Sequence, residues 1–204
     1  MKRPLIIIFL VLLIDQVIKI YIKTHFVLGE EYKITSWFII HFTENNGMAY
    51  GMQFSGQYGK VFLSVFRIVA VAGIGWYLIR LVKGKAHWGL VTSISLIFAG
   101  ALGNILDSAF YGLIFSDSNY DIAKVFPHEG GYAGFLHGKV VDMLYFPILE
   151  GHFPTWFPVW GSEEFIFFRP VFNCSDSAIT IGVILILLFQ RKFYPRKEDK
   201  VEIS

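Results

Sequence analysis

Four long apolar stretches constrain the fold of this chain more than any other feature of its sequence. They cover residues 4–24, 60–82, 88–111 and 172–190. At about 1.5 Å of rise per residue, helices of this length cross most or all of the roughly 30 Å hydrocarbon core of a bilayer. Charged residues are only 17% of the chain and the mean hydropathy is +0.53. The sequence therefore predicts an α-helical integral membrane protein with four transmembrane helices, forming one membrane-embedded domain over residues 1–204.

The first apolar stretch begins like a secretory signal peptide, because Lys2 and Arg3 precede it. The apolar run continues past Asp15 and Lys19, however, and no small-x-small cleavage site precedes Gly29. We therefore expect a retained transmembrane helix. Counting from its start puts Asp15 and Lys19 near mid-depth, where they would form a structural polar pair at i,i+4 spacing.

The basic residues predict how the four helices are oriented. They cluster at three places that share one side of a four-span arrangement: Lys2 and Arg3; Arg80, Lys83 and Lys85; and Arg191, Lys192, Arg196, Lys197 and Lys200. By the positive-inside rule this side is cytoplasmic. Both termini are then cytoplasmic, and the segments 25–59 and 112–171 face outward.

The first outer segment contains a candidate strand over residues 37–43, with Phe38, Ile40 and Phe42 on one face. Asn46-Gly47 follows, and Asn-Gly is a strong hairpin signal. We expect a small antiparallel β-sheet at the membrane surface. The second outer segment is too long to be a simple connection.

Several classes of function are not expected from the composition. A net charge of +2 without a basic, aromatic-rich patch gives no reason to expect a nucleic-acid partner. The six histidines lack a metal-binding spacing, so no metal and no cofactor is expected. Cys174 is the only cysteine and is interpreted as a small buried side chain.

Three acids are expected in one layer near the outer ends of the helices. Asp107 lies about 28 Å along the third helix, and Asp176 lies about 6 Å into the fourth helix from the outside. Asp142 occupies an apolar outer stretch that can reach the same layer. Placing an acidic side chain in or near hydrocarbon costs free energy, so such a residue indicates a functional site. Residue patterns alone leave two alternatives open, a catalytic carboxylate pair that shares a proton or an ion or proton relay in a small membrane carrier.

Five blocks of residues occur along the chain in the same order as the motifs of one protein family. They are Asp15-Gln16 with Lys19; Asn46-Gly47 with Ala49, Tyr50 and Gly51; Gly100-Ala101-Leu102-Gly103-Asn104 with Asp107 and Gly112; Val140-Val141-Asp142; and Phe172-Asn173 with Asp176, Ala178 and Ile179. On these blocks the chain resembles the lipoprotein signal peptidases, also called signal peptidase II. The resemblance covers most of the sequence.

The resemblance implies a bacterial inner-membrane aspartyl endopeptidase with four transmembrane helices, an outer β-cradle and an active site near the periplasmic face. It implies that Asp142 and Asp176 are the catalytic pair. It assigns orienting or substrate-binding roles to Asn46, Gly47, Asn104, Asp107 and Asn173. The implied substrate is a prolipoprotein that carries a diacylglyceryl group on cysteine and is cut on the amino side of that cysteine. We expect the enzyme to work as a monomer among membrane lipids. Because the dipole of the fourth helix favours a charged Asp176, Asp142 would hold the proton.

The sequence departs from the family pattern in two places. The family usually has Arg after the third-helix Asp, where this chain has Ser108. From its depth in the second helix, Arg67 is expected to supply the missing charge partner of Asp107. The outer segments 113–138 and 150–169 are also longer than usual, and could form a lid, a partner surface or packing.

Overall fold

The computed structural model describes residues 2–45, 57–147, 149–152, 164–167 and 170–194. Its helices are α1 (Lys2–His25), α2 (Gln57–Lys83), α3 (Trp88–Leu106), α5 (Cys174–Leu188) and the short α6 (Gln190–Phe193). A π-helical turn, η2 (Asp107–Tyr111), and α4 (Gly112–Ile114) extend α3. Within these described ranges, three helical segments are long and apolar enough to cross a membrane, namely Lys2–His25, Ser64–Lys83 and Trp88–Ile114. The fourth predicted span is apolar but shorter, because α5 has only 15 residues.

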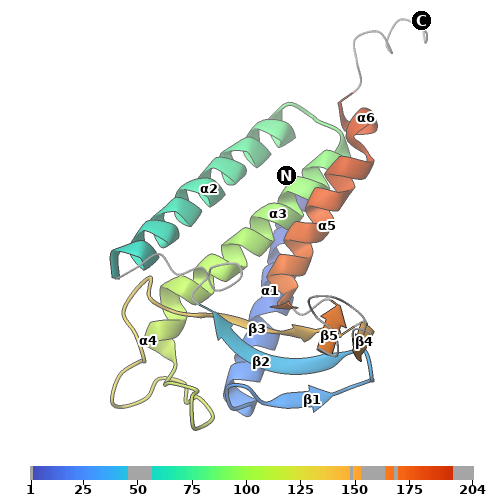
Figure 1. The fold of residues 1–204 in the computed structure, drawn as a ribbon. Coiled ribbons are helices and arrows are strands. Elements are labelled where there is room, and N and C mark those ends of the chain that lie inside the picture. The colour runs from blue at the N-terminus through green and yellow to red at the C-terminus, as the bar shows by residue number, and fades with distance from the viewer. Residues whose placement is uncertain (1, 46–56, 148, 153–163, 168–169, 195–204) are drawn as a thin grey trace, which may run out of the picture.

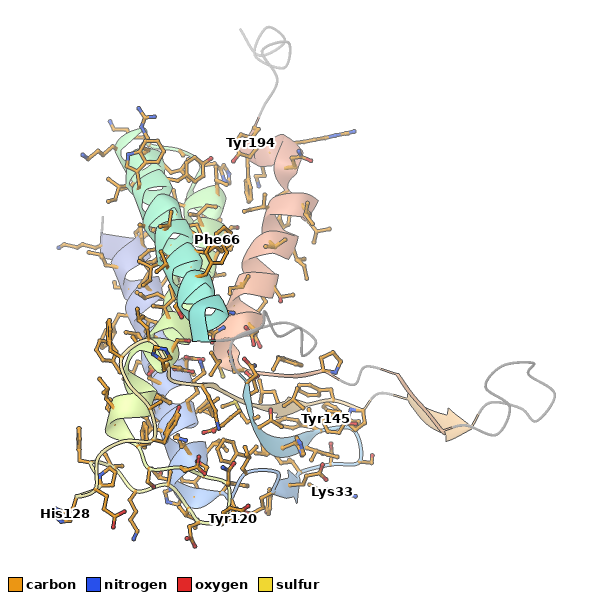
Figure 2. The ribbon with its side chains drawn as sticks, turned by 60° about the vertical axis from the view of Figure 1, so that its left-hand side comes forward. Lys33, Phe66, Tyr120, His128, Tyr145 and Tyr194 are labelled. Atoms are coloured by element: carbon orange, nitrogen blue, oxygen red, sulfur yellow. The ribbon has the colours of Figure 1, made fainter. Side chains whose placement is uncertain are left out.

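Helix α3 packs against α1, α2 and α5, and small residues make the α3–α5 contact close (Figure 1). A Cβ atom added at Gly100 would lie 2.2 Å from the backbone oxygen of Ser175, and one added at Gly103 would lie 2.2 Å from the Ser175 Oγ. These glycines therefore let the two helices approach closely. Large apolar side chains such as Phe66, which is 62% exposed, cover the outside of the helices (Figure 2). Such an apolar exterior suits a lipid environment.

A small antiparallel sheet lies at one end of the helices (Figure 1). Its strands are β1 (Glu31–Lys33), β2 (Ile39–Asn45), β3 (Val140–Tyr145) and β6 (Val171–Phe172), in the order β1-β2-β3-β6. A separate pair, β4 (Leu149–His152) and β5 (Glu164–Phe167), extends to the side in Figure 2. The predicted fold class, helices with a small β-sheet, is confirmed.

The predicted strand at residues 37–43 is shifted. Ile40 and Phe42 of its predicted face pack in one core, but Ile39 is buried as well. The strand runs from Ile39 to Asn45, and a register irregularity lies between Ile40 and Thr43. Because an extra residue changes the alternation, Ile39 and Phe42 are both buried. The turn predicted at 46–47 lies outside the described residues, and β2 pairs with β1 and β3.

The sheet shares its hydrophobic core with the ends of α1 and α3. Phe42 of β2 and Val141 and Met143 of β3 are fully buried in one cluster with Ile22 of α1 and Tyr111 of η2. Helix α1 therefore continues as far as the sheet. Asp142, which lies between Val141 and Met143, is fixed in position by this core.

The described part of the long outer segment packs on the end of α3. Its backbone bonds run from Gly138 N to Ser108 O and from Ala133 N to Gly112 O, at 2.9 and 3.0 Å. A Cβ atom at Gly138 would lie 2.2 Å from the backbone oxygen of Asp107. Among the three possibilities for residues 113–138, these contacts support packing around the end of α3.

Candidate active site

Asp176 is held at the start of α5 by a capping box. The Asn173 side chain accepts a hydrogen bond from the Asp176 backbone N–H at 3.0 Å, and the Asn173 N–H donates to Asp176 Oδ2 at 3.3 Å. Asparagine is a favoured N-cap because its side-chain oxygen satisfies a free backbone donor. The other carboxylate oxygen, Oδ1, accepts from Asn104 Nδ2 of α3 at 2.8 Å. Asp176 therefore has a fixed orientation near the positive end of the helix dipole.

Asp142 lies in β3, opposite Thr43 of β2, and is only 3% exposed. Its Oδ1 accepts from Asn173 Nδ2 at 2.6 Å, and its Oδ2 accepts from the side-chain amide of Asn45. Asn173 thus contacts both acids, through its backbone N–H and its side chain. One residue couples the strand that carries Asp142 to the helix that carries Asp176.

The environment of Asp142 favours its protonated form. Burial raises the pKa of Asp142 to about 7, and the nearby charge of Asp176 adds to this effect. The hydrogen bonds from Asn173 and Asn45 and the charge of Lys19 act in the opposite direction. Near neutral pH, Asp142 can therefore exchange a proton while it stays beside a second carboxyl group.

A buried cation connects the remaining acids to this pair. Lys19 of α1 is fully buried, and its Nζ lies 3.0 Å from Asp15 Oδ2 and 2.8 Å from Asp107 Oδ2. The same nitrogen donates to Asn104 Oδ1 at 2.9 Å. Because Asn104 in turn donates to Asp176, Lys19 orients the pair through one intermediate side chain.

Asp15 and Asp107 extend the network to the backbone of α5 and β3. Asp15 Oδ1 accepts from the Ser175 N–H at 2.8 Å. Asp107 Oδ2 accepts from the Val141 N–H at 3.3 Å, directly beside Asp142. The three acids predicted in one layer, at positions 107, 142 and 176, are thus brought together, and Asp15 joins them.

Two predictions about this layer are wrong. Asp15 and Lys19 do pair, but they are not separated in height from the other acids. Asp15 lies level with the start of α5, because α1 continues beyond it to the core of the sheet. The cationic partner of Asp107 is Lys19, not Arg67. Arg67 instead interacts electrostatically with Asp176 and Asp142. Asn46 and Gly47 lie outside the described residues.

Sequence reasoning missed two side chains that contact site residues. Asn45 donates to Asp142, and Gln16 donates to Asp107 Oδ1 at 2.9 Å and to Asp15 Oδ2 at 3.1 Å. Gln16 could have been identified from the sequence, because it directly follows Asp15. The contact of Asn45 depends on pairing between distant strands, and no local pattern reveals it.

A second buried ion cluster supports the sheet from the end of α1. Glu44 pairs with the fully buried Lys23 and, at 3.2 Å, with Lys139. Lys23 also donates to Ser118 Oγ at 2.8 Å and lies 4.9 Å from the centre of the Tyr132 ring. This cluster joins α1, β2 and the long outer segment next to Asn45.

Glu44→Ala is expected to destabilise the protein by about 3–5 kcal/mol, because it leaves Lys23 buried without its carboxylate. Thermal or denaturant unfolding in detergent measures the change. Glu31→Ala is the matched control, since the Glu31 side chain is 43% exposed and an exposed pair contributes about 1 kcal/mol or less. Equal losses in the two variants would show that the cluster contributes no more than a surface pair.

The fold and the site together define a class of protein. Apolar helices carry a sheet at one end (Figure 1). Two carboxyl groups, one from a strand and one from a helix, are joined there by one asparagine. This is an integral membrane protein with a carboxylate pair of the kind that aspartic hydrolases use. Within the described residues, no group of three or more His, Cys, Asp or Glu side chains is arranged to hold a metal ion.

The family model described as signal peptidase (SPase) II matches residues 7–191, and the chain belongs to this family. A lipoprotein signal peptidase of Porphyromonas gingivalis is 52% identical over 188 residues, which are 92% of this chain and 80% of the relative. One from Amoebophilus asiaticus is 37% identical over 200 residues, with 96% and 80% covered. The chain is therefore a multi-pass bacterial membrane protein and a membrane aspartic protease by family.

Solved structures of similar fold are bacterial membrane enzymes. One structure has a TM-score of 0.63 at 24% identity and covers 97% of this chain, with 93% of its own chain matched. Another has a TM-score of 0.62 at 26% identity, with 95% of this chain and 96% of the other matched. The arrangement of helices and sheet is thus shared with known membrane enzymes.

Proposed function

We propose that this protein removes the signal peptide from prolipoproteins whose cysteine carries a diacylglyceryl group, and that it cuts on the amino side of that cysteine. The observation that carries the proposal is the joint contact of Asn173 with Asp142 and Asp176. Family membership supports the same function. The alternative of an ion-coupled carrier is not supported, since the relatives are named as lipoprotein signal peptidases.

In the proposed mechanism, Asp176 acts as the base and Asp142 as the acid. The ionised Asp176 takes a proton from water as the water attacks the scissile carbonyl, and the protonated Asp142 donates to the carbonyl oxygen. The leaving amine is then protonated as the roles reset. The raised pKa of Asp142, about 7 by burial and the charge of Asp176, supports this assignment.

The positions of sheet and helices support a substrate that is held by its lipid. The elements that carry the two acids, β3 and the start of α5, lie where the helices meet the sheet (Figure 1). A scissile bond at the acids would therefore be next to a lipid chain in the bilayer. Binding energy from the lipid would then orient the reacting bond. We propose that this layer faces the periplasm and both termini the cytoplasm, because basic residues cluster at the opposite helix ends.

Cleavage of two matched precursors tests the proposed function. The purified protein in proteoliposomes is expected to cut a diacylglyceryl-modified precursor peptide next to its cysteine. It is expected to cut the same peptide with an unmodified cysteine at least about 100-fold more slowly, since the remote binding energy is lost. Equal cleavage of both peptides, or of neither, would contradict the proposal.

A further inference from the structure

A cavity is lined by the start of α1 and by the residues around the turn between α2 and α3. This turn lies at the end of the helices opposite the sheet (Figure 1). Its volume is about 420 Å³, within the range of small-ligand sites. Ile7 and Val91 contribute apolar walls, and Lys2, Arg3, Lys85 and Trp88 also line it. The cavity therefore combines an apolar interior with a cationic rim, and it is separate from the candidate active site.

The charged residues that line this cavity in the described part of the chain are all basic. No acidic residue lines it, and residues 2–14 and 76–106 contain no Asp or Glu. Among the described residues, no ion pair involves Lys2, Arg3 or Lys85. Trp88 is 70% exposed beside them, as is common for a tryptophan at a membrane interface. Three cations that form no ion pair with any described acid favour an anionic ligand.

The backbone of Lys85 adds an independent observation. Lys85 follows α2 with φ of 52°, in the left-handed region that favours glycine. The Lys85 N–H donates to Val82 O at 3.2 Å and the Ala86 N–H donates to Leu81 O at 3.0 Å, the pattern of a helix-ending Schellman motif. A lysine at such a position is conformationally unfavourable, so its presence points to a role for the side chain.

We propose that this cavity binds the headgroup of an anionic phospholipid from the leaflet that surrounds this end of the helices. The phosphodiester oxygens accept hydrogen bonds from Lys2, Arg3 and Lys85, and an acyl chain follows the apolar wall toward Ile7 and Val91. A lipid fits better than a free anion because much of the lining is apolar. This site does not depend on the proposed peptidase function.

Native mass spectrometry of the detergent-solubilised protein with added phosphatidylglycerol tests the proposal. The triple variant Lys2→Gln/Arg3→Gln/Lys85→Gln is expected to lower the affinity about tenfold or more, which corresponds to about 1.4 kcal/mol. The control Lys83→Gln/Arg191→Gln/Lys192→Gln removes the same charge from the same end, outside the cavity lining, and is expected to change the affinity less than about twofold. Equal losses in both triple variants, or no loss in the first, would overturn the proposal.

Lys85→Gly separates ligand binding from folding. Glycine accepts the left-handed backbone, so this variant is expected to unfold at the same or a higher temperature, yet to lower phosphatidylglycerol affinity about threefold or more. An unchanged affinity would contradict a role for the Lys85 side chain. Two further results would overturn the assignment to an anionic lipid: equal binding of phosphatidylcholine, or displacement of phosphatidylglycerol by millimolar inorganic phosphate.

Discussion

Asp142→Asn and Asp176→Asn, made singly, are each expected to slow cleavage of a lipidated precursor by about 10²–10⁴-fold or more, the range that general acid–base groups contribute. Asn at position 142 cannot give a proton to the carbonyl oxygen, and Asn at position 176 cannot take one from water. Initial rates in proteoliposomes measure the effect. Asn45, Asn104 and Asn173, whose side chains hydrogen-bond to the two acids, do not titrate and cannot take over either role.

The comparison requires folded variants and a neutral control. An amide at position 142 places an NH₂ group against a donor from Asn45 or Asn173, which costs about 1–3 kcal/mol, so unfolding is measured in parallel. Asp117→Asn changes an exposed acid of the outer segment and is expected to keep full activity. Near-normal cleavage by either folded active-site variant would rule out the proposed mechanism.

Lys19→Met is expected to destabilise the protein by about 3–5 kcal/mol and to reduce cleavage. Methionine keeps most of the unbranched side chain but removes the charge, which leaves the fully buried carboxylates of Asp15 and Asp107 without this cation. It also removes the donor that orients Asn104 toward Asp176. Thermal unfolding and cleavage rates are measured on the same preparation.

A double variant shows whether the loss of stability in Lys19→Met comes from the lost charge or from the changed shape of the side chain. Lys19→Met/Asp107→Asn removes one buried carboxylate together with the cation and is expected to recover part of the lost stability. Lys33→Met, on the exposed strand β1, is the control and is expected to change stability by less than about 0.5 kcal/mol. Additive losses in the double variant would mean that Lys19 and Asp107 do not interact.

The membrane helices were predictable because lipid imposes a simple rule. A chain in hydrocarbon must satisfy its backbone hydrogen bonds within each helix, so long apolar stretches at 4–24, 60–82 and 88–111 indicate spans directly. The fourth span was predicted too long at both ends. Its start is fixed at Cys174 by the Asn173 cap, and α5 ends at Leu188, before Phe189.

The position of α1 along the helix direction, relative to the other helices and the sheet, was not predictable by counting residues. The count assumed that the helix begins at one membrane surface and ends at the other. In the structure α1 reaches the core of the sheet, where Ile22 packs beside Phe42. This extension moves Lys19 into the layer of Asp107 and Asn104, and explains why the cation sought near Ser108 comes from another helix.

The acid pair was predictable only in part from residue patterns. Depth placed Asp107, Asp142 and Asp176 together but did not select a pair, and the family resemblance pointed to the last two. Which side chains form hydrogen bonds with these acids depends on the pairing of strands that are far apart in the sequence. Asn45 reaches Asp142 because β2 pairs with β3 across 97 positions of sequence, with a register irregularity that hydropathy patterns do not show.

Titration of Asp142 by carboxyl ¹³C NMR, in the wild type and in Asp176→Asn, tests most directly whether the two acids act as a coupled pair. We expect a midpoint near a pKa of about 7 in the wild type, because burial and the charge of Asp176 raise the pKa of Asp142. In Asp176→Asn the midpoint should fall, because the like charge is gone while burial remains. A wild-type midpoint near the ordinary value of about 4, or one that Asp176→Asn leaves unchanged, would contradict the account.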